Sequence, residues 1–217
     1  MSMPLNRIDA GLAGNPLVLA IQRRISANRF DPTRQVSDAR IAELVGLATR
    51  APTAFNLQNW RFIAVRTPEA KQRLRKVAQD QAKVTDAAVV FIVCGQPPCH
   101  ETLAARLQPA VAAGFMPPEM PAIWVEATKA SYENQPQKQR DEAIRSASFG
   151  AAMLILAAEA HGLASCVMGG FDPAGVAHDF GLAADEIPVV LVAIGFAAAG
   201  NWPQKPRRPV ADMLAFV

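Results

Sequence analysis

The chain has 217 residues, of which 51% are hydrophobic and 19% are charged, and its formal net charge at pH 7 is +3. This composition excludes intrinsic disorder, and glycines and prolines that follow no period exclude a collagen-like chain. The longest uncharged helical run, 146–158, is too short to cross a membrane, and residues 1–13 lack the pattern of a signal peptide. We therefore expect a folded cytoplasmic protein without a transmembrane helix.

The first half of the chain is predicted to alternate helices with strands. Asn15 followed by Pro16 is a favourable helix start, and apolar residues then recur at every fourth position. Pro52 restricts the residue before it, which sets the end of a second helix. The elements expected here are a helix over 16–27, a helix from 37 to about 50, a loop over 51–59, a strand over 60–66, a helix starting at 67–69 and a buried strand over 87–94.

The second half is predicted to begin with an irregular or mobile excursion over 95–136, which is rich in prolines and small residues. Residues 137–161 should form a long helix that is apolar on nearly all sides after Ala147, as a helix through the middle of a core must be. The other elements expected are a short helix at 122–131 within the excursion, a strand over 163–168, a short helix from 172 to Gly181, a strand over 189–196 and a tail over 200–217 with little core. Because no internal repeat recurs, helices mixed with buried strands predict one α+β or α/β domain over 1–217.

Common catalytic and metal-binding motifs are absent from the sequence. There is no dinucleotide-binding glycine motif, P-loop, nucleophile elbow or zincin motif. The histidines are scattered without ligand spacing, so no metal site is expected. Cys94, Cys99 and Cys166 contain no closely spaced pair, which predicts reduced thiols rather than a disulfide framework.

Basic residues gather near both ends of the chain. The two groups are Arg23, Arg24 and Arg29 near the start, and Lys205, Arg207 and Arg208 near the end. The simplest interpretation is solvated surface charge. The alternative is that both groups converge on one anion such as a phosphate. Nucleic-acid binding is disfavoured because no basic stretch is interleaved with aromatic residues.

Two carboxamides stand out in the expected loop over 51–59. Asn56 and Gln58 lie between apolar residues. A carboxamide offers a donor and an acceptor together, which suits the alternating edge of a planar heterocycle. These side chains could equally satisfy the backbone groups of their own loop.

Four motifs in this order resemble the nitroreductase family of FMN-dependent oxidoreductases, over about 17–209. Residues 24–30 are similar to its Arg-x-Ser-x-basic-x-Phe pattern and residues 51–60 to its Ala-Pro-Ser-x-x-Asn-x-Gln-Pro-Trp loop. Residues 162–172 resemble its glycine-bounded segment, and residues 205–207 its closing Lys-x-Arg. The sequence departs from the family at Asn28, where Arg or Lys is usual, and at Asn59, where Pro is usual.

The resemblance implies an α+β fold in which a central, mostly antiparallel sheet is flanked by helices, with one long central helix. It further implies an intertwined homodimer whose flavin sites are built from both subunits. FMN would be the cofactor and NADH or NADPH the electron donor. The implied reaction is ping-pong hydride transfer through flavin N5 to a nitroaromatic, a quinone or a similar flat small molecule, without a catalytic side chain.

The resemblance also assigns roles to residues of this sequence. Phosphate contacts are implied for the basic motifs, ring and ribityl contacts for the loop, and a close backbone approach to N5 for the glycine-bounded segment. The implied cofactor residues are Arg23, Arg24, Ser26, Asn28, Pro52, Thr53, Ala54, Asn56, Gln58, Gln81, Lys83, Met168, Gly169, Gly170, Lys205, Arg207 and Arg208. The excursion over 95–136 would wall the substrate side, and its candidate contacts are Phe115, Met116, Trp124 and Tyr132.

Three other functions stay open at this point. The chain could store or sense a flavin without turnover, because no catalytic side chain is identified. It could carry out another flavin reaction, such as dehalogenation or enone reduction, because the motifs indicate FMN and not a substrate. It could instead bind an anion or a nucleic acid through its basic ends.

Overall fold

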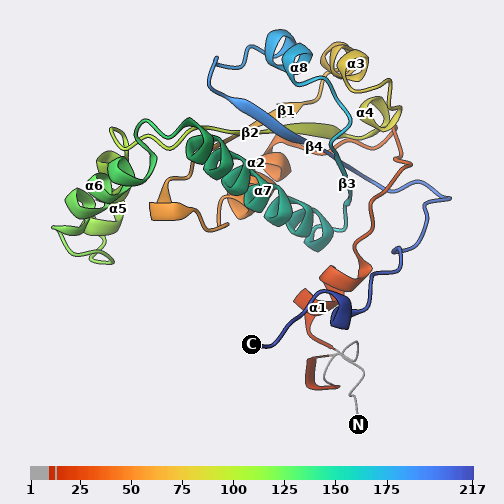
Figure 1. The fold of residues 1–217 in the computed structure, drawn as a ribbon. Helices are drawn as coiled ribbons and strands as arrows, with labels where there is room; N and C mark the ends of the chain where they lie inside the picture. Colours follow the sequence, from red (N-terminus) through yellow and green to blue (C-terminus); the bar gives the residue numbers. More distant parts are fainter. Residues whose placement is uncertain (1–9, 13) are drawn as a thin grey trace.

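A four-stranded antiparallel sheet organises the fold of the computed structural model, which describes residues 10–12 and 14–217 (Figure 1). The strand order is β1-β2-β4-β3. The strands are β1 Trp60–Val65, β2 Val89–Gly95, β3 Ala164–Met168 and β4 Ile187–Gly195. The expected α+β class with a mostly antiparallel sheet is confirmed. Residues 1–9 and 13, which belong to the stretch without a signal-peptide pattern, lie outside the described residues.

Helices α1, α2 and α3 begin where local capping chemistry predicts. The Asn15 side chain accepts hydrogen bonds from the amides of Leu17 and Val18, and Ser37 and Thr67 cap the next long helices in the same way. The α-helices are α1 Pro16–Arg23, α2 Asp38–Ala48, α3 Pro68–Val77, α4 Lys83–Asp86, α5 Leu103–Ala112, α6 Met120–Tyr132, α7 Pro136–Ala160 and α8 Pro173–Asp179. Short 3-10 turns are η1 Ala10–Leu12, η2 Ala54–Asn56 and η3 Val210–Asp212.

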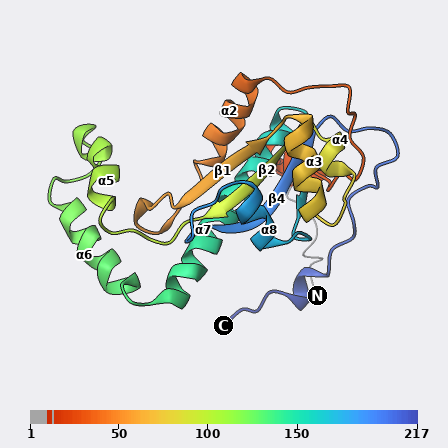
Figure 2. The same cartoon turned by 90° about the horizontal axis from the view of Figure 1, so that it is seen from above.

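Helices cover both faces of the sheet (Figures 1 and 2). Alternate residues of β2 point to opposite faces, as the two-residue period of a strand requires. Phe91 and Val93 join a core with α2 and α7, whereas Val90 and Ile92 join a core with α3 and α8. The sheet is therefore the middle layer, and β2 is buried along its whole length.

The long helix α7 is the central core helix that its sequence predicts. It packs against α2 and against strands β2 and β4. Among the described helices, α7 alone is long and apolar enough to cross a membrane, and 44% of its most apolar 18-residue window is buried in the fold. Gly95 lies where this helix crosses β2, and a Cβ atom there would collide with the carbonyl of Ala143.

Two sequence predictions about local structure are wrong. The first helix does not reach residue 27 but ends at Arg23, because Arg24, with φ −54° and ψ 127°, leaves the helical conformation and Ser26 forms a bridge to Ser165 of β3. The segment 95–136 is not irregular, since it contains α5 as well as α6, the helix expected at 122–131. Pro109 lies inside α5, and this local signal against a helix is outweighed by packing.

Helices α5 and α6 form an arm that stands away from the sheet (Figures 1 and 2). Its base is a small apolar cluster in which Leu103 and Leu107 of α5 are fully buried with Leu57. Leu57 follows η2, so the arm is fixed to the loop between α2 and β1. Through this cluster, the loop with the two carboxamides and the arm form one unit.

Candidate functional site

The two ends of the chain meet beside β3 and β4. The amide of Ala27 donates to the Ser165 carbonyl over 2.9 Å, and the amide of Asp31 donates to the Phe196 carbonyl over 2.8 Å. Residues 24–31 are therefore held between the edge of the sheet and the C-terminal tail. This pairing brings the N-terminal basic group next to the C-terminal one.

Gln204 connects these two basic groups directly. Its Nε2 donates to the Arg24 carbonyl over 2.9 Å, and its Oε1 accepts from Nη2 of Arg207 over 3.0 Å. Arg24 and Arg207 thus lie on either side of one carboxamide, although the sequence separates them by most of the chain. The main chain of Arg24 and the side chain of Arg207 are thereby held close together.

The basic residues near the two chain ends differ in whether an acidic residue pairs with them. Among the described residues, no Asp or Glu forms an ion pair with Arg24, Lys205 or Arg207. Arg23 instead approaches Glu159, with 3.7 Å between Nε and Oε1, and Arg208 donates to the Asp212 carbonyl. Three cations close to the Gln204 link are therefore left available for an anion.

A second set of expected residues joins the same end of the sheet. Nζ of Lys83, at the start of α4, donates to Oδ1 of Asn28 over 3.2 Å and lies 3.5 Å from Sγ of Cys166. Gln81 donates from Nε2 to the Gly170 carbonyl over 2.9 Å. The buried Met168 ends β3 immediately before this glycine pair. At Gly169 a Cβ would meet nothing within 4 Å, so the backbone there is open to approach.

The loop that contains Asn56 and Gln58 has a constrained backbone. Phe55, Asn56 and Gln58 have φ values of 50°, 54° and 47°, in the left-handed region that non-glycine residues seldom adopt. Each such residue costs on the order of 1–3 kcal/mol, and the conformation persists only where the surrounding structure holds it. Oγ1 of Thr53 accepts from the Gln58 amide over 3.0 Å and closes the loop.

The carboxamides themselves do not stabilise this loop. Asn56 and Gln58 are exposed, and neither side chain hydrogen-bonds to any residue within 10–12 or 14–217. The alternative that they satisfy their own loop backbone is therefore wrong, since Thr53 provides that contact. Both side chains remain available for a ligand. The neighbouring residues Pro52 and Ala54 present backbone on the same loop.

Three of the four expected substrate contacts lie in the arm cluster beside this loop. The ring of Trp124 makes an edge contact with Phe55, with 6.1 Å between centroids, and Met116 and Tyr132 pack in the same cluster. The Tyr132 hydroxyl donates to Glu142 over 3.2 Å, and burial, together with this carboxylate, raises the pKa of Tyr132. Phe115 lies outside the cluster and is 86% exposed.

The predicted cofactor residues therefore form two separate groups. The phosphate group comprises the segments around 24–28, 81–83, 168–170 and 205–207, and the ring loop comprises 52–58 with the arm. The segments around 24–28, 81–83 and 205–207 lie on the opposite side of the sheet from the ring loop and the arm (Figures 1 and 2), whereas Met168 pairs with Leu191 in the middle of β4.

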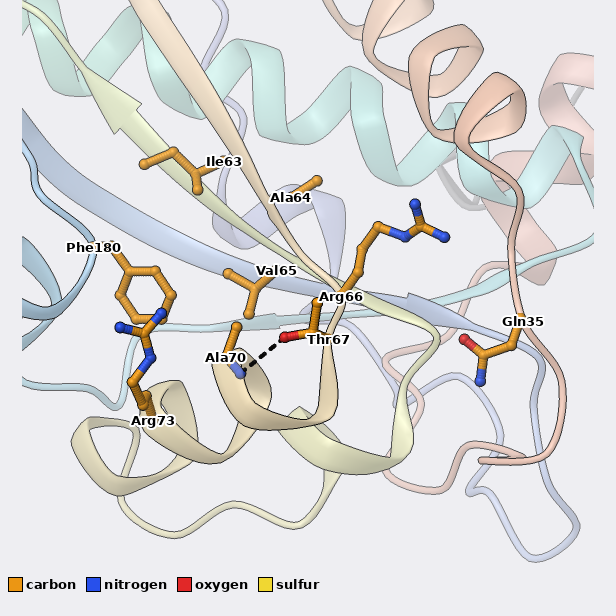
Figure 3. A pocket seen from close by; sticks show the side chains of 9 residues that line it. All are labelled: Gln35, Ile63, Ala64, Val65, Arg66, Thr67, Ala70, Arg73 and Phe180. Carbon is orange, nitrogen blue, oxygen red and sulfur yellow. Dashed lines mark hydrogen bonds between the residues drawn. The ribbon is translucent and has the colours of Figure 1, made fainter.

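A surface pocket lies apart from both groups. It has a volume of about 520 Å³ between β1 and α3, and Gln35, Arg66, Arg73 and Phe180 are among its lining residues (Figure 3). None of the residues predicted to bind cofactor or substrate lines it. This pocket therefore does not coincide with the basic groups of the two chain ends.

The cysteines have the character expected from their spacing. All three are free, and Cys94 and Cys166 are buried while Cys99 is partly exposed. Burial raises the pKa of the Cys94 thiol to about 12, and the nearby Glu186 carboxylate adds to the shift. Cys94 therefore stays protonated near neutral pH and does not act as a nucleophile.

Asn201 and Gln204 are the site residues that sequence reasoning missed. Both side chains bind the backbone of residues 24–29 from the C-terminal tail. The available signal was a pair of carboxamides close to Lys205 and Arg207 in a segment with little core. That signal was too weak to identify their partners, which lie at the other end of the chain.

Comparison with known proteins gives consistent matches. The model of the nitroreductase family matches residues 21–196. Protein DrgA of Synechocystis is 38% identical over 81% of this chain and 81% of its own, and NADH dehydrogenase of Thermus thermophilus is 33% identical over 85% of this chain and 87% of its own. The crystal structure of a candidate nitroreductase from Exiguobacterium sibiricum in complex with FMN has a TM-score of 0.84 and 28% identity, covering 97% of this chain and 98% of that one.

Proposed function

Because this chain belongs to the nitroreductase family, we propose that it is an FMN-dependent NAD(P)H oxidoreductase that works as a cytoplasmic homodimer. The FMN-bound structure and the NADH dehydrogenase among its relatives support this cofactor and this donor. The reaction class is hydride transfer to a flat electron acceptor such as a nitroaromatic or a quinone.

The observation that carries the proposal is that Gln204 joins the main chain of Arg24 to the side chain of Arg207, while no described Asp or Glu pairs with Arg24, Lys205 or Arg207. Arg24, Lys205 and Arg207 would bind the FMN phosphate, because charge-assisted hydrogen bonds to phosphate are the strongest contacts such side chains make. The exposed Ser26 and Asn28 lie on the same segment as Arg24 and can add neutral hydrogen bonds. The donor set therefore fits a phosphate dianion.

The loop on the other side of the sheet fits the rest of the cofactor. Asn56 and Gln58 would hydrogen-bond the ring edge and the ribityl chain, together with the backbone of 52–54. FMN, when bound, supplies the hydride-transfer chemistry at flavin N5. The backbone of 168–170 would border N5, where the open backbone at Gly169 permits a close approach. The chain's own part is to hold the ring and leave one face open to the donor and the acceptor in turn.

The arm would supply the wall of the acceptor site. Met116, Trp124 and Tyr132 pack beside the ring loop and present apolar and aromatic surface. Phe115 is exposed at the junction between α5 and α6, where a second chain or a substrate can reach it. Flat acceptors suit such a surface because aromatic side chains bind planar rings by stacking.

A homodimer follows from the separation of the two groups. One flavin can contact the phosphate group and the ring loop only if they come from different chains. The described surface also exposes large apolar side chains, among them Leu17, Phe149 and Phe216. Exposed apolar groups of this size are typical of surfaces that are covered in an assembly.

Visible absorption of the purified protein tests the proposal. We expect a flavin band that bleaches on anaerobic addition of NADH or NADPH and recovers when an acceptor is added. A panel of a nitroaromatic, a quinone, an enone and a halogenated aromatic then separates the possible reactions. A flavin band that neither donor bleaches would support storage or sensing instead. Salt-dependent DNA binding without flavin uptake would support the nucleic-acid alternative.

A further inference from the structure

The side chain of Asn201 is fully hydrogen-bonded between the two ends of the chain. Its Oδ1 accepts from the amides of Asn28 and Arg29, over 2.7 and 3.0 Å. Its Nδ2 donates to the carbonyls of Arg29 and Ala198, over 2.8 and 3.0 Å. These four bonds use the two acceptor and two donor positions that a carboxamide offers. No other natural side chain of this size offers the same pattern.

A glycine turn directs Asn201 toward this segment. Gly200 has φ of 85°, in the left-handed region that glycine adopts without cost. A Cβ atom on Gly200 would lie 2.9 Å from Nη1 of Arg29, so a side chain here would also displace that guanidinium. The tail therefore turns tightly against Arg29 before it continues to Lys205.

Gln204 repeats the same kind of bridge three residues later. It donates to the backbone of Arg24 and accepts from the guanidinium of Arg207. Asn201 and Gln204 are both neutral, so they fix the two segments without neutralising the cations. A carboxylate in either place would form an ion pair with a neighbouring arginine and compete with a bound phosphate.

We propose that Asn201 and Gln204 are positioning residues, which set the spacing between the phosphate-binding cations of the two chain ends. The inference rests on the proposed function, because it assigns these cations to the FMN phosphate. Asn201 fixes the main chain at residues 28–29, and Gln204 fixes the main chain at Arg24 and the side chain of Arg207. Neither residue needs to touch the cofactor itself.

The test compares FMN with riboflavin, which shares the ring and ribityl chain but lacks the phosphate. Flavin affinity is measured by fluorescence quenching on the flavin-free protein, for the wild type, Asn201→Ala, Gln204→Ala and Gln204→Glu. We expect each alanine variant to bind FMN about ten-fold more weakly, as the loss of one or two net hydrogen bonds predicts. Gln204→Glu should be weaker still, and riboflavin affinity should not change. Gln22→Ala, an exposed carboxamide on α1, is the matched control.

The outcomes separate this inference from the proposed function. A wild type that binds neither flavin would overturn the proposed function and the inference with it. A wild type that binds FMN, with variants that lose both flavins equally or lose neither, would overturn the inference alone. A fall in melting temperature accompanied by equal losses would show a purely structural role. Selective loss of FMN over riboflavin is the result that a positioning role requires.

Discussion

Lys83 and Asn28 are joined by a hydrogen bond of 3.2 Å from Nζ to Oδ1, which links the start of α4 to the N-terminal basic segment. Residue 28 is neutral in this chain, yet an ammonium group lies beside it. The amide of Asn28 is in turn held by Asn201. A cation from a different element thus accompanies Asn28 in the phosphate group.

Substitution of Asn28 should weaken FMN binding through Lys83. Asn28→Ala removes the acceptor that holds the ammonium, and we expect a loss of roughly 1 kcal/mol, the typical net value of one hydrogen bond. Asn28→Asp should weaken binding further, because the new carboxylate pairs with Lys83 and repels the phosphate. Flavin titration of the two variants measures the difference. If Asn28→Asp binds FMN as tightly as the wild type, Lys83 plays no part in the site.

Arg207→Ala should weaken FMN by roughly 1.5–3 kcal/mol, the value of one hydrogen bond to a charged group. The loss should be smaller at high salt, because screening weakens the contact between Arg207 and the phosphate, which only the wild type makes. Equilibrium titration with FMN measures the effect. Arg40→Ala on α2, an exposed arginine outside the phosphate group, is the charge-matched control. If Arg207→Ala binds FMN with unchanged affinity, Lys205 or Arg208 makes the phosphate contact instead.

Two glycine-to-alanine changes should have opposite effects on stability. Gly95→Ala forces a methyl group against the Ala143 backbone of α7, and we expect the free energy of unfolding to fall by about 1–3 kcal/mol. In Gly46→Ala, on α2, the new methyl group would have no neighbour within 4 Å. This change should raise the free energy of unfolding by about 1 kcal/mol, because alanine has the higher helix propensity. Urea unfolding measures both. Equal effects would contradict the close crossing of α7 over β2.

Acid should destabilise the fold through Glu186. Burial alone would raise the pKa of this carboxyl, but hydrogen bonds from the Ala183 amide, Gln96 and Arg61 hold it below the ordinary value of 4.5. Because the pKa of Glu186 is lower in the folded than in the unfolded state, its ionised carboxylate stabilises the fold above pH 4.5. This stabilisation is lost as the pH falls through the folded-state pKa.

Glu186→Gln therefore should unfold more readily near neutral pH and show a flatter dependence of stability on pH below 4.5. Urea unfolding at a series of pH values provides the comparison. Glu126→Gln, at an exposed position on α6, is the control that should keep the wild-type profile. A parallel profile in Glu186→Gln would contradict the assigned role of the carboxylate.

The parts of the fold that depend on local chemistry were predictable from the sequence. Asn15, Ser37 and Thr67 each accept a hydrogen bond from the helix that follows, and such caps need only neighbouring residues. Helix α5 was not predictable, because Pro109 argues against it locally. Its stability depends on burial against Leu57, which is distant in the sequence.

Some features of the candidate site could likewise be predicted from the sequence, and others could not. The motif around Arg24 and the carboxamides at Asn56 and Gln58 could be identified because each belongs to a short, contiguous sequence motif. The bridges from Asn201 could not, since their partners at residues 28 and 29 lie 173 and 172 residues away. The separation of the phosphate group from the ring loop also required the structure, because sequence order says nothing about which side of the sheet each occupies.

In the proposed homodimer, one flavin is held by the phosphate group of one chain and the ring loop of the other. Co-expression of an Arg24→Ala/Arg207→Ala chain with an Asn56→Ala/Gln58→Ala chain tests it, with flavin content measured on the purified mixed dimer. Each variant alone should bind little FMN, whereas the mixed dimer should contain one intact site and regain half of the wild-type flavin content. A mixed dimer without flavin would contradict a site shared between chains. If each site were built within a single chain, both sites of the mixed dimer would carry substitutions and neither would bind FMN.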